Sequence, residues 1–377
     1  MGGVNMEWKE DVLGNVLEVK YGKDHKKLAD GQYPVYGSGG LMRYVDSKLY
    51  DGPSILIPRK GTLNNIMFVE SPFWTVDTMF WSIINTDKVD PKFLFYSICK
   101  RDFASMNVGS AVPSMTVNIL NDIQISYPEN IEDQRRIASI LSSLDRKIEL
   151  NNKINADLEE MAQAIFKNWF VDFEPFKDGK FVDSELGMIP EGWKVGTLED
   201  IAEITMGQSP AGNSLNENRE GMIFYQGSSD FGFRFPSIRV FTTEPKRLAV
   251  ANSVLFSVRA PVGDINVAKE ECCIGRGVAS IKSKYGHDSY LFYTMKSLHK
   301  LFDSFDGEGT VFGSINKKTL SAIQILLPSD GIVEQFNNIA SSFDNRIRSL
   351  SDENSHLSLL RDTLLPRLMS GELEIPE

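Results

Sequence analysis

Two stretches of helical periodicity, one in the middle of the chain and one near its end, constrain the fold of this 377-residue sequence most strongly. Apolar residues recur at alternating steps of four and three over Glu132–Trp169, and the pattern returns over Phe336–Leu368. This spacing is typical of a helix whose apolar seam packs against another helix. Neither Glu132–Trp169 nor Val333–Leu365 contains proline, so each helix can run for roughly 35 residues, about 50 Å.

The two seams match each other in detail. A shift of 199 residues places Leu357 on Leu158 and Asn354 on Asn155. Either each helix belongs to the core of its own domain, or the two helices pair as an antiparallel coiled coil; the second is favoured because helices of this length are unusual in ordinary cores. In an antiparallel pair Asn155 and Asn354 would come close and set the register, unless both face solvent.

The repeat extends into the parts of the chain between the helices. Trp8 and Gly22 recur 185 residues later, whereas Gly109 and Ser114 recur 200 residues later. Self-similarity at so long a period indicates a duplicated unit, with pseudo-twofold symmetry if the helices pair. The predicted division is a first globular domain at 1–128, a spacer helix at 129–170, a linker at 171–192, a second globular domain at 193–328, and a C-terminal helix and tail at 329–377.

Each globular domain contains both strand and helix signals, which predicts an α+β fold class. Short apolar runs at Ser54–Pro58 and Ser253–Val258 and an alternating run at Thr78–Ile84 indicate strands. Asp90 followed by Pro91 is typical of a helix start, and Asp288 opens the matching helix.

Composition and motifs favour a binding protein over an enzyme. The sequence has no apolar run long enough to span a membrane and no apolar signal core, so we expect a cytoplasmic protein. Its three cysteines lack zinc or disulfide spacing and are expected to be buried free thiols. No metal-ligand spacing, nucleophile elbow or phosphate-binding loop is present. Most of the net charge of −11 lies in the helical stretches, so a nearly neutral globular domain can still present a basic face.

Several stretches resemble one known family. The motifs are FKNWFVDFEP at Phe166–Pro175, SELGMIPEGWKVGTLEDI at Ser184–Ile201, LRDTLLPRLMSGEL at Leu360–Leu373, YPVYGSGG at Tyr33–Gly40 and IPRKGT at Ile57–Thr62. Together they are similar to the specificity subunit of type I restriction-modification enzymes, over essentially the whole chain.

That resemblance implies a function in host defence. Each globular domain would be a target recognition domain for double-stranded DNA, and the paired helices would hold the two readers of a bipartite target apart. The chain would carry no cofactor itself. It would bind two modification subunits, which hold S-adenosylmethionine and methylate adenine N6, and two restriction subunits, which use ATP and Mg²⁺. The aromatic cluster Trp169, Phe170 and Phe173 would pack within the linker or anchor a partner subunit.

Residues that touch DNA are predicted only as basic and polar side chains in expected loops. Lys side chains suit phosphates, and Arg or Gln side chains suit base edges, but each can equally be a solvated surface group. Arg59 and Arg259 stand out because each follows an apolar strand in the matching place. The candidates are Lys20, Lys23, Lys26, Lys27, Ser38, Arg43, Arg59, Lys60, Gln208, Ser209, Arg234, Arg239, Arg247, Arg259 and Arg276.

Two alternatives to this function are open at the level of sequence. One is a coiled-coil adaptor whose globular domains bind proteins, and the other is a nucleic-acid-modifying enzyme with a cryptic site. The sequence does not decide the target bases, the gap between half-sites, the presence of a restriction subunit, or whether Met1 or Met6 is the native start.

Overall fold

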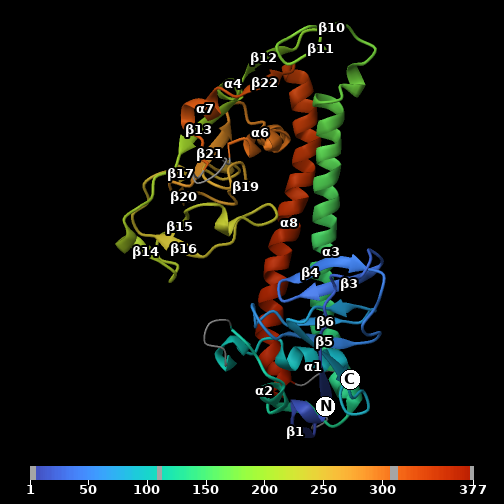
Figure 1. Cartoon of the computed structure of the whole chain (residues 1–377). Helices are drawn as coiled ribbons and strands as arrows, with labels where there is room; N and C mark the ends of the chain where they lie inside the picture. The colour runs from blue at the N-terminus through green and yellow to red at the C-terminus, as the bar shows by residue number, and fades with distance from the viewer. Residues whose placement is uncertain (1–5, 108–112, 306–312, 374–377) are drawn as a thin grey trace, which may run out of the picture. The chain divides into compact units, whose positions relative to one another are not determined.

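The computed structural model describes residues 6–107, 113–305 and 313–373, and Figure 1 follows the chain through them. Met1, Gly109 and Gly309 lie outside this part. The chain divides into unit 1, made of Met1–Asn151 and Ser351–Glu377, and unit 2, made of Asn152–Leu350. Within the described ranges, no helix is both long enough and apolar enough to cross a membrane.

The two predicted long helices are confirmed. Helix α3 spans Ile131–Phe170 and helix α8 spans Asp330–Met369, 40 residues each. Helix α8 also passes through Pro366, which directly follows the proline-free stretch Val333–Leu365. Proline there removes one backbone hydrogen bond in the last helical turn. The buried side chains of Leu365 and Leu368, which belong to the core of unit 1, hold that turn in place.

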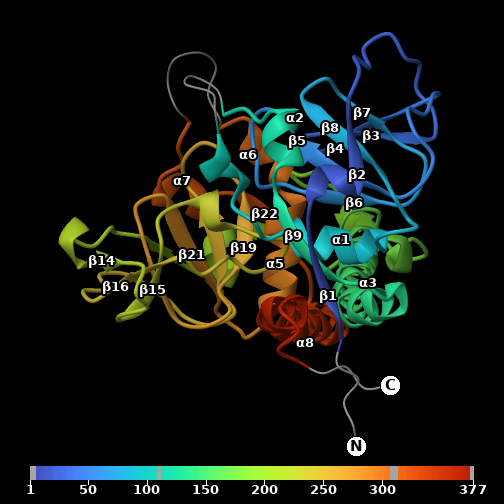
Figure 2. The same ribbon diagram turned by 90° about the horizontal axis from the view of Figure 1, so that it is seen from below.

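Each long helix is divided between the two units, and within each unit the helical segments run antiparallel. In unit 1, Asp145 of α3 binds Arg361 of α8, while Asn151, six residues further along α3, binds Asn354, which precedes Arg361. Figure 2, seen from below, shows the coils of α3 and α8 next to each other. In unit 2, Phe336 of α8 contacts Phe166 and Phe170 of α3.

The described part of unit 1 contains three small sheets. Strand β1 pairs with β9, a second sheet has the order β2-β8-β5-β6, and a third has the order β4-β3-β7. Its strands are β1 (Trp8–Val12), β2 (Leu17–Tyr21), β3 (Tyr33–Gly37), β4 (Gly40–Val45), β5 (Ser54–Pro58), β6 (Met67–Val69), β7 (Trp74–Thr75), β8 (Met79–Ile84) and β9 (Gln124–Pro128). Its short helices are η1 (Leu13–Asn15), α1 (Pro91–Ile98), η2 (Phe103–Met106) and α2 (Val117–Asn121).

Unit 2 repeats this arrangement. Strand β12 pairs with β22, and the larger sheets have the orders β13-β21-β18-β19 and β14-β16-β15-β20-β17. These strands are β12 (Lys194–Thr197), β13 (Ala202–Met206), β14 (Leu215–Asn216), β15 (Met222–Tyr225), β16 (Val240–Thr242), β17 (Leu248–Ala249), β18 (Val254–Ser257), β19 (Ile265–Val267), β20 (Cys272–Ile274), β21 (Val278–Ser283) and β22 (Gln324–Leu327). The short helices are α4 (Leu198–Ile201), η4 (Gly212–Ser214), η5 (Ser228–Asp230), α5 (Asp288–Ser297), α6 (His299–Asp303) and α7 (Lys317–Ser321).

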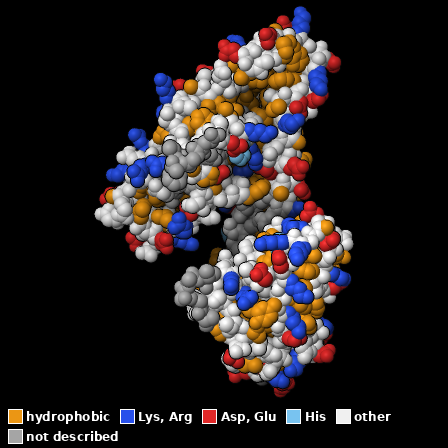
Figure 3. Space-filling view, in the orientation of Figure 1, with side chains coloured by type: hydrophobic (Ala, Val, Ile, Leu, Met, Phe, Trp, Pro, Cys, Tyr) orange, Lys and Arg blue, Asp and Glu red, His pale blue; other side chains and the backbone are white. Residues whose placement is uncertain are grey.

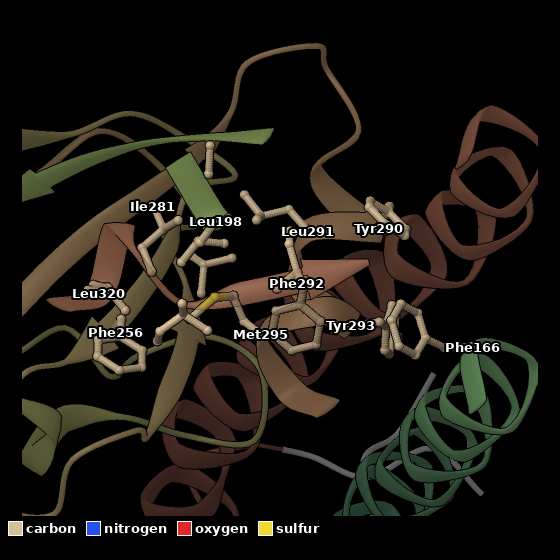
Figure 4. Packing of buried hydrophobic residues seen from close by; sticks show 14 of the residues in the cluster. Phe166, Leu198, Phe256, Ile281, Tyr290, Leu291, Phe292, Tyr293, Met295 and Leu320 are labelled. Carbon is tan, nitrogen blue, oxygen red and sulfur yellow. The ribbon is translucent and has the colours of Figure 1, made fainter. Parts of the chain in front are cut away.

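The long helices contribute directly to both hydrophobic cores. Ile137 and Leu141 of α3 belong to the core of unit 1, together with Phe93 of α1. In unit 2, Phe166 of α3 packs with the aromatic residues of α5, as Figure 4 shows for Tyr290 and Tyr293. The alternative in which each helix serves a single domain core is therefore wrong, because α3 and α8 each supply side chains to two cores.

Both predicted helix starts are confirmed. Asp90 caps α1 by accepting a hydrogen bond from the Phe93 backbone N–H at 3.0 Å, with Pro91 as the first helical residue. Asp288 is the first residue of α5 instead of its cap, and its carboxylate binds the Lys282 ammonium at 2.6 Å. Local capping chemistry thus differs between the two copies of this helix.

The stretch expected to be a linker is folded. It forms the 3-10 helix η3 (Glu174–Phe176) and a two-stranded sheet of β10 (Phe181–Val182) and β11 (Ile189–Pro190). Phe170 and Phe173 both pack against the Trp193 ring, with ring centroids 5.9 and 5.5 Å away. The aromatic cluster at the end of α3 therefore belongs to the packing of unit 2.

The cysteines are free thiols, as expected, although only two of them are fully buried. Cys272 and Cys273 lie in β20, while Cys99 is half-buried. Burial raises the pKa of the Cys99 thiol to about 11 and that of the Cys272 thiol to about 12. Both thiols are therefore neutral at physiological pH, which does not suit a nucleophile.

Candidate nucleic-acid interface

In unit 1, one end of the central sheet brings several predicted residues together. Strands β2 and β5 both run antiparallel to β8, so their final residues meet at the start of β8. The Lys23 N–H donates to the Thr75 carbonyl at 2.9 Å, and the Lys60 N–H donates to the Thr78 carbonyl at 3.2 Å. We call this place, with Lys23, Arg59 and Lys60, the strand-end edge of unit 1.

Unit 2 builds the same edge with the same backbone contacts. The Gly207 N–H donates to the Val278 carbonyl at 2.9 Å, as Gly22 does to Met79 at 3.0 Å in unit 1. The Gln208 N–H donates to the Ile274 carbonyl at 2.9 Å, so Gln208 takes the place that Lys23 has in unit 1.

The structure corrects the predicted match between Arg59 and Arg259. The Arg59 N–H donates to Thr78, and the equivalent bond in unit 2 comes from Val258, which donates to Gly277. Isolated bridges then pair Lys60 with Ser114 and Arg259 with Ser314. Lys60 is therefore the counterpart of Arg259, because the offset between the two copies is 199 residues in these strands and 200 at the serines.

The edge of unit 2 holds five of the predicted residues. The Arg247 carbonyl accepts a hydrogen bond from the Ile274 N–H at 2.9 Å at the end of β20, and Arg276 lies in the turn between β20 and β21. Arg259 lies two residues after the end of β18. The members of the strand-end edge of unit 2 are Gln208, Ser209, Arg247, Arg259 and Arg276.

Ion pairing separates the candidates more clearly than their position on the surface. In Figure 3, Lys and Arg side chains on the visible face are interspersed with acidic ones, so surface charge alone singles out no stripe. The cations of the two edges share the absence of a salt bridge to any carboxylate among the described residues. They are Lys23, Arg59 and Lys60 in unit 1 and Arg247, Arg259 and Arg276 in unit 2. Arg59 donates to the Asp77 backbone carbonyl at 3.4 Å and lies 5.3 Å from the centroid of the Tyr21 ring. Cations that are not held by a carboxylate can bind phosphates or base edges without breaking an ion pair.

Several other candidates are engaged elsewhere. Lys20 pairs with Glu18, Arg43 binds the Leu28 carbonyl and Asp30, and Arg239 binds Asp230 and Glu217. Lys26 and Lys27 are exposed in the segment between β2 and β3. Ser38, half-buried between β3 and β4, lies beside Gly61, which follows Lys60. Of these residues only Ser38 is placed next to a strand-end edge.

Arg234 is removed from the set of DNA-binding candidates. Its side chain is only 3% exposed, and it binds Glu159 of α3 and Asp344 of α8. The guanidinium also donates to the Tyr293 hydroxyl at 2.9 Å and lies 4.1 Å from the centroid of the Phe292 ring. A side chain held on all sides in this way cannot reach DNA; it anchors the segment between β15 and β16 to the helices of unit 2.

The charges around Arg234 support one another. Burial on its own would raise the pKa of Glu159, but Arg234 and Lys296 together hold that pKa below its ordinary value of 4.5. Burial likewise opposes the charged form of Arg234, but Asp344, Tyr293 and Glu159 together outweigh it, so the pKa of Arg234 is raised. Glu159 and Arg234 therefore stay ionised at neutral pH, and the network is structural.

Gln226 is the residue of the edge that sequence reasoning missed. It follows β15, is exposed, and its side-chain Oε1 accepts a hydrogen bond from the Ser209 hydroxyl at 3.0 Å. The same hydroxyl accepts a hydrogen bond from the Arg276 N–H at 3.2 Å. In the sequence, the glycines Gly207, Gly275 and Gly277 could have indicated this place, because glycine is typical where backbone segments approach closely.

Asn155 and Asn354, the two residues predicted to set the register of the long helices, lie in different units. In unit 1, the buried Asn151 side chain donates to Asn354 at 2.9 Å and to Glu353 at 3.0 Å. Asn155 is buried but belongs to unit 2, so its pairing with Asn354 stays a prediction. Asn151, which was not among the predicted register residues, is the observed partner of Asn354 in unit 1.

No group of three or more His, Cys, Asp and Glu side chains is arranged to hold a metal ion within residues 6–107, 113–305 and 313–373. Apart from the exposed Asp77 carboxylate in unit 1, the polar side chains at the two edges carry hydroxyl, amide, ammonium and guanidinium groups. These are donors suited to phosphate oxygens and base edges.

The chain has two matched α+β units that share a pair of long helices, and each unit has a cationic strand-end edge. These features are those of a DNA-recognition protein with two recognition domains. The family model described as the type I restriction modification DNA specificity domain matches residues 5–160 and again residues 190–358. The chain belongs to this family.

Named relatives agree with this assignment. The chain is 33% identical over 303 residues to a putative type I restriction enzyme MjaX specificity subunit of Methanocaldococcus jannaschii, covering 77% of this chain and 70% of the relative. It is 26% identical over 391 residues to the type I restriction enzyme HindI specificity subunit of Haemophilus influenzae, covering 81% and 83%. The crystal structure of a type I restriction-modification system S subunit from M. genitalium shares the fold, with a TM-score of 0.61 at 16% identity, over 97% of this chain and 96% of that one.

Proposed function

We propose that this chain is the DNA-specificity subunit of a type I restriction-modification system, in which each unit recognises one half of a bipartite target. The observation that carries the proposal is the duplicated strand-end edge. The backbone frame is the same in both units, while the side chains on it differ: Lys23 and Lys60 in one, Gln208 and Arg259 in the other. A shared frame with different side chains suits two readers of different half-sites.

The remaining parts of the proposal concern partners and chemistry. The chain itself would be non-catalytic and hold no cofactor. Two modification subunits would bind it and supply S-adenosylmethionine for methylation of adenine N6. Two restriction subunits would add ATP- and Mg²⁺-dependent cleavage. The assembly would act in the cytoplasm, where the cell's DNA is found.

The test is the methylome of cells that express this chain with the modification subunit encoded beside it. The expected result is a new N6-methyladenine motif in two parts separated by unspecified bases. The matched control expresses the modification subunit alone and should show no such motif. A complex that assembles but adds no motif would refute the proposal and favour the coiled-coil adaptor.

A triple replacement of Arg247, Arg259 and Arg276 by alanine tests whether the edge of unit 2 carries binding. We expect loss of DNA affinity in the assembled complex, because three cations without carboxylate partners in the described structure are removed. Replacement of Arg239, which is already paired with Asp230, is the control and should leave affinity nearly unchanged.

A further inference from the structure

We propose that Gln226, held by Ser209 and flanked by Arg276, is the base-reading element of unit 2, and that it recognises an A·T pair beside a G·C pair in the major groove. This inference rests on the proposed function and deepens it, because it names the side chains that decide one half of the target. It also assigns a role to Gln226, which carries no charge and therefore escapes any search for basic patches.

The Ser209 hydroxyl fixes the direction of the Gln226 amide. It accepts a hydrogen bond from the Arg276 backbone N–H at 3.2 Å and donates its own hydrogen to Gln226 Oε1 at 3.0 Å. A hydroxyl has one hydrogen to donate, so this pairing orients the amide with its Nε2 group directed away from Ser209. An exposed amide held in this way loses little side-chain entropy on binding.

Three glycines allow the strands to converge around Gln226. A Cβ atom at Gly207 would lie 2.2 Å from the Gly275 carbonyl oxygen, and one at Gly277 would lie 2.5 Å from the Gln226 carbonyl oxygen. A Cβ atom at Gly275 would lie 2.6 Å from Gln226 Oε1 itself. These separations are closer than real side chains allow, so any other residue would displace the backbone or the amide.

The chemistry of the exposed groups points to base edges. A Gln amide can bind adenine N6 and N7 together, and an Arg guanidinium can bind guanine O6 and N7. Oε1 of Gln226 has a second lone pair for the adenine amino group while Ser209 occupies the first. Arg276 and Gln226 come from neighbouring strand ends, so their bases would be close together in the target.

Unit 1 provides an internal comparison. The Val76 N–H donates to the Tyr36 carbonyl as Gly275 does to Tyr225, which places Gly37 where unit 2 has Gln226 and Asp77 where unit 2 has Arg276. Neither Gly37 nor Asp77 can make the contacts proposed for Gln226 and Arg276. The element is therefore specific to one unit, and its loss should alter one half of the target only.

The experiment compares the wild-type complex with complexes carrying Gln226→Ala, Arg276→Ala or Ser209→Ala. Each complex, with its modification subunit, is tested in cells by methylome sequencing and in solution against duplexes substituted at every position of the motif. Lys246→Ala, which removes an exposed charge next to Arg247, is the matched control. Gln226→Asn serves as a second, conservative variant that keeps the amide but shortens its reach.

We expect Gln226→Ala to lose discrimination at one A·T position and Arg276→Ala at one G·C position, each by roughly 5- to 150-fold, the factor for one bidentate base contact. Ser209→Ala should weaken discrimination at the same A·T position as Gln226→Ala. The half-site read by unit 1 should stay unchanged in all variants, which also shows that the complex is folded.

Three results would overturn the inference, each in a different way. If the wild-type complex yields a bipartite motif and the Gln226 and Arg276 variants keep that motif at every position, the reading element is elsewhere. If a variant weakens all sequences equally, its side chain contacts phosphates instead of bases. Absence of any motif with the wild-type complex refutes the proposed function itself and with it this inference.

Discussion

Replacing Arg234 by methionine removes the cation at the centre of the buried network in unit 2. Methionine fills a similar space without charge, so Glu159 is left with Lys296 and the Gln163 amide, and Asp344 with the Tyr293 hydroxyl. Breaking a buried ion pair by removing one partner typically costs about 3–5 kcal/mol. We expect a loss of that size in the stability of unit 2.

Hydrogen exchange of the α5 backbone amides measures this loss, because α5 carries Tyr293 and Phe292 into the core of unit 2. A loss of 3 kcal/mol corresponds to exchange about 150-fold faster, and 5 kcal/mol to several thousand-fold. The control is Arg239→Met, whose ion pair with Asp230 is exposed on the arginine side and should be worth about 1 kcal/mol or less.

An Arg234→Met protein whose α5 amides exchange within tenfold of wild type would refute the reasoning. A second check is the double variant Arg234→Met with Glu159→Gln, which removes the uncompensated charge. It should recover part of the lost protection, because the cost comes mainly from leaving a carboxylate buried without its partner.

Three further predictions concern the same structure. The pKa of Glu159 is held below 4.5 in the folded state, so its ionised form stabilises unit 2 above pH 4.5 and this stabilisation should be lost as the pH falls below 4.5. The loss of stability per pH unit should be smaller in Arg234→Met than in wild type, as measured by hydrogen exchange of the α5 amides at decreasing pH. An equal pH dependence in the two proteins would show that this prediction is wrong. Lys60→Ala should weaken DNA binding of the assembled complex about equally for all sequences and reduce the salt slope by about 1, as measured by titration in increasing salt; a change in the methylated motif would instead mean that Lys60 reads bases. Asn151→Leu should lower the stability of unit 1 by about 1–3 kcal/mol because the Asn354 amide oxygen loses this donor, and thermal unfolding that shows no loss would argue against a role for the pair.

Periodicity predicted the long helices because burying an apolar seam depends on local spacing alone. A short apolar run predicted β5, and Asp90 followed by Pro91 predicted the capping of α1, since both depend on a few consecutive residues. The match between Arg59 and Arg259 failed because the offset between copies changes along the chain, and only backbone pairing fixes it at 199 in these strands.

The site was predicted less well than the fold, because its residues contact partners that are far away in the sequence. Arg234 looks like any surface arginine in sequence, because Glu159 and Asp344, which surround it, are 75 and 110 residues away. Gln226 was overlooked because a search for cations has no reason to select an amide. Its partner Ser209 is 17 residues away, and only folding brings the two together.

The sharing of α8 between the units sets an order of events during synthesis. Unit 1 begins with the first residues of the chain, yet Leu365 and Leu368 complete its core. All of Asn152–Leu350 must therefore be translated first, which takes roughly 10 to 40 seconds at about 5–20 residues per second. During that interval the apolar surface of unit 1 that later packs against α8 is exposed. Unit 2 can therefore complete its fold before unit 1, although most of unit 1 is translated earlier.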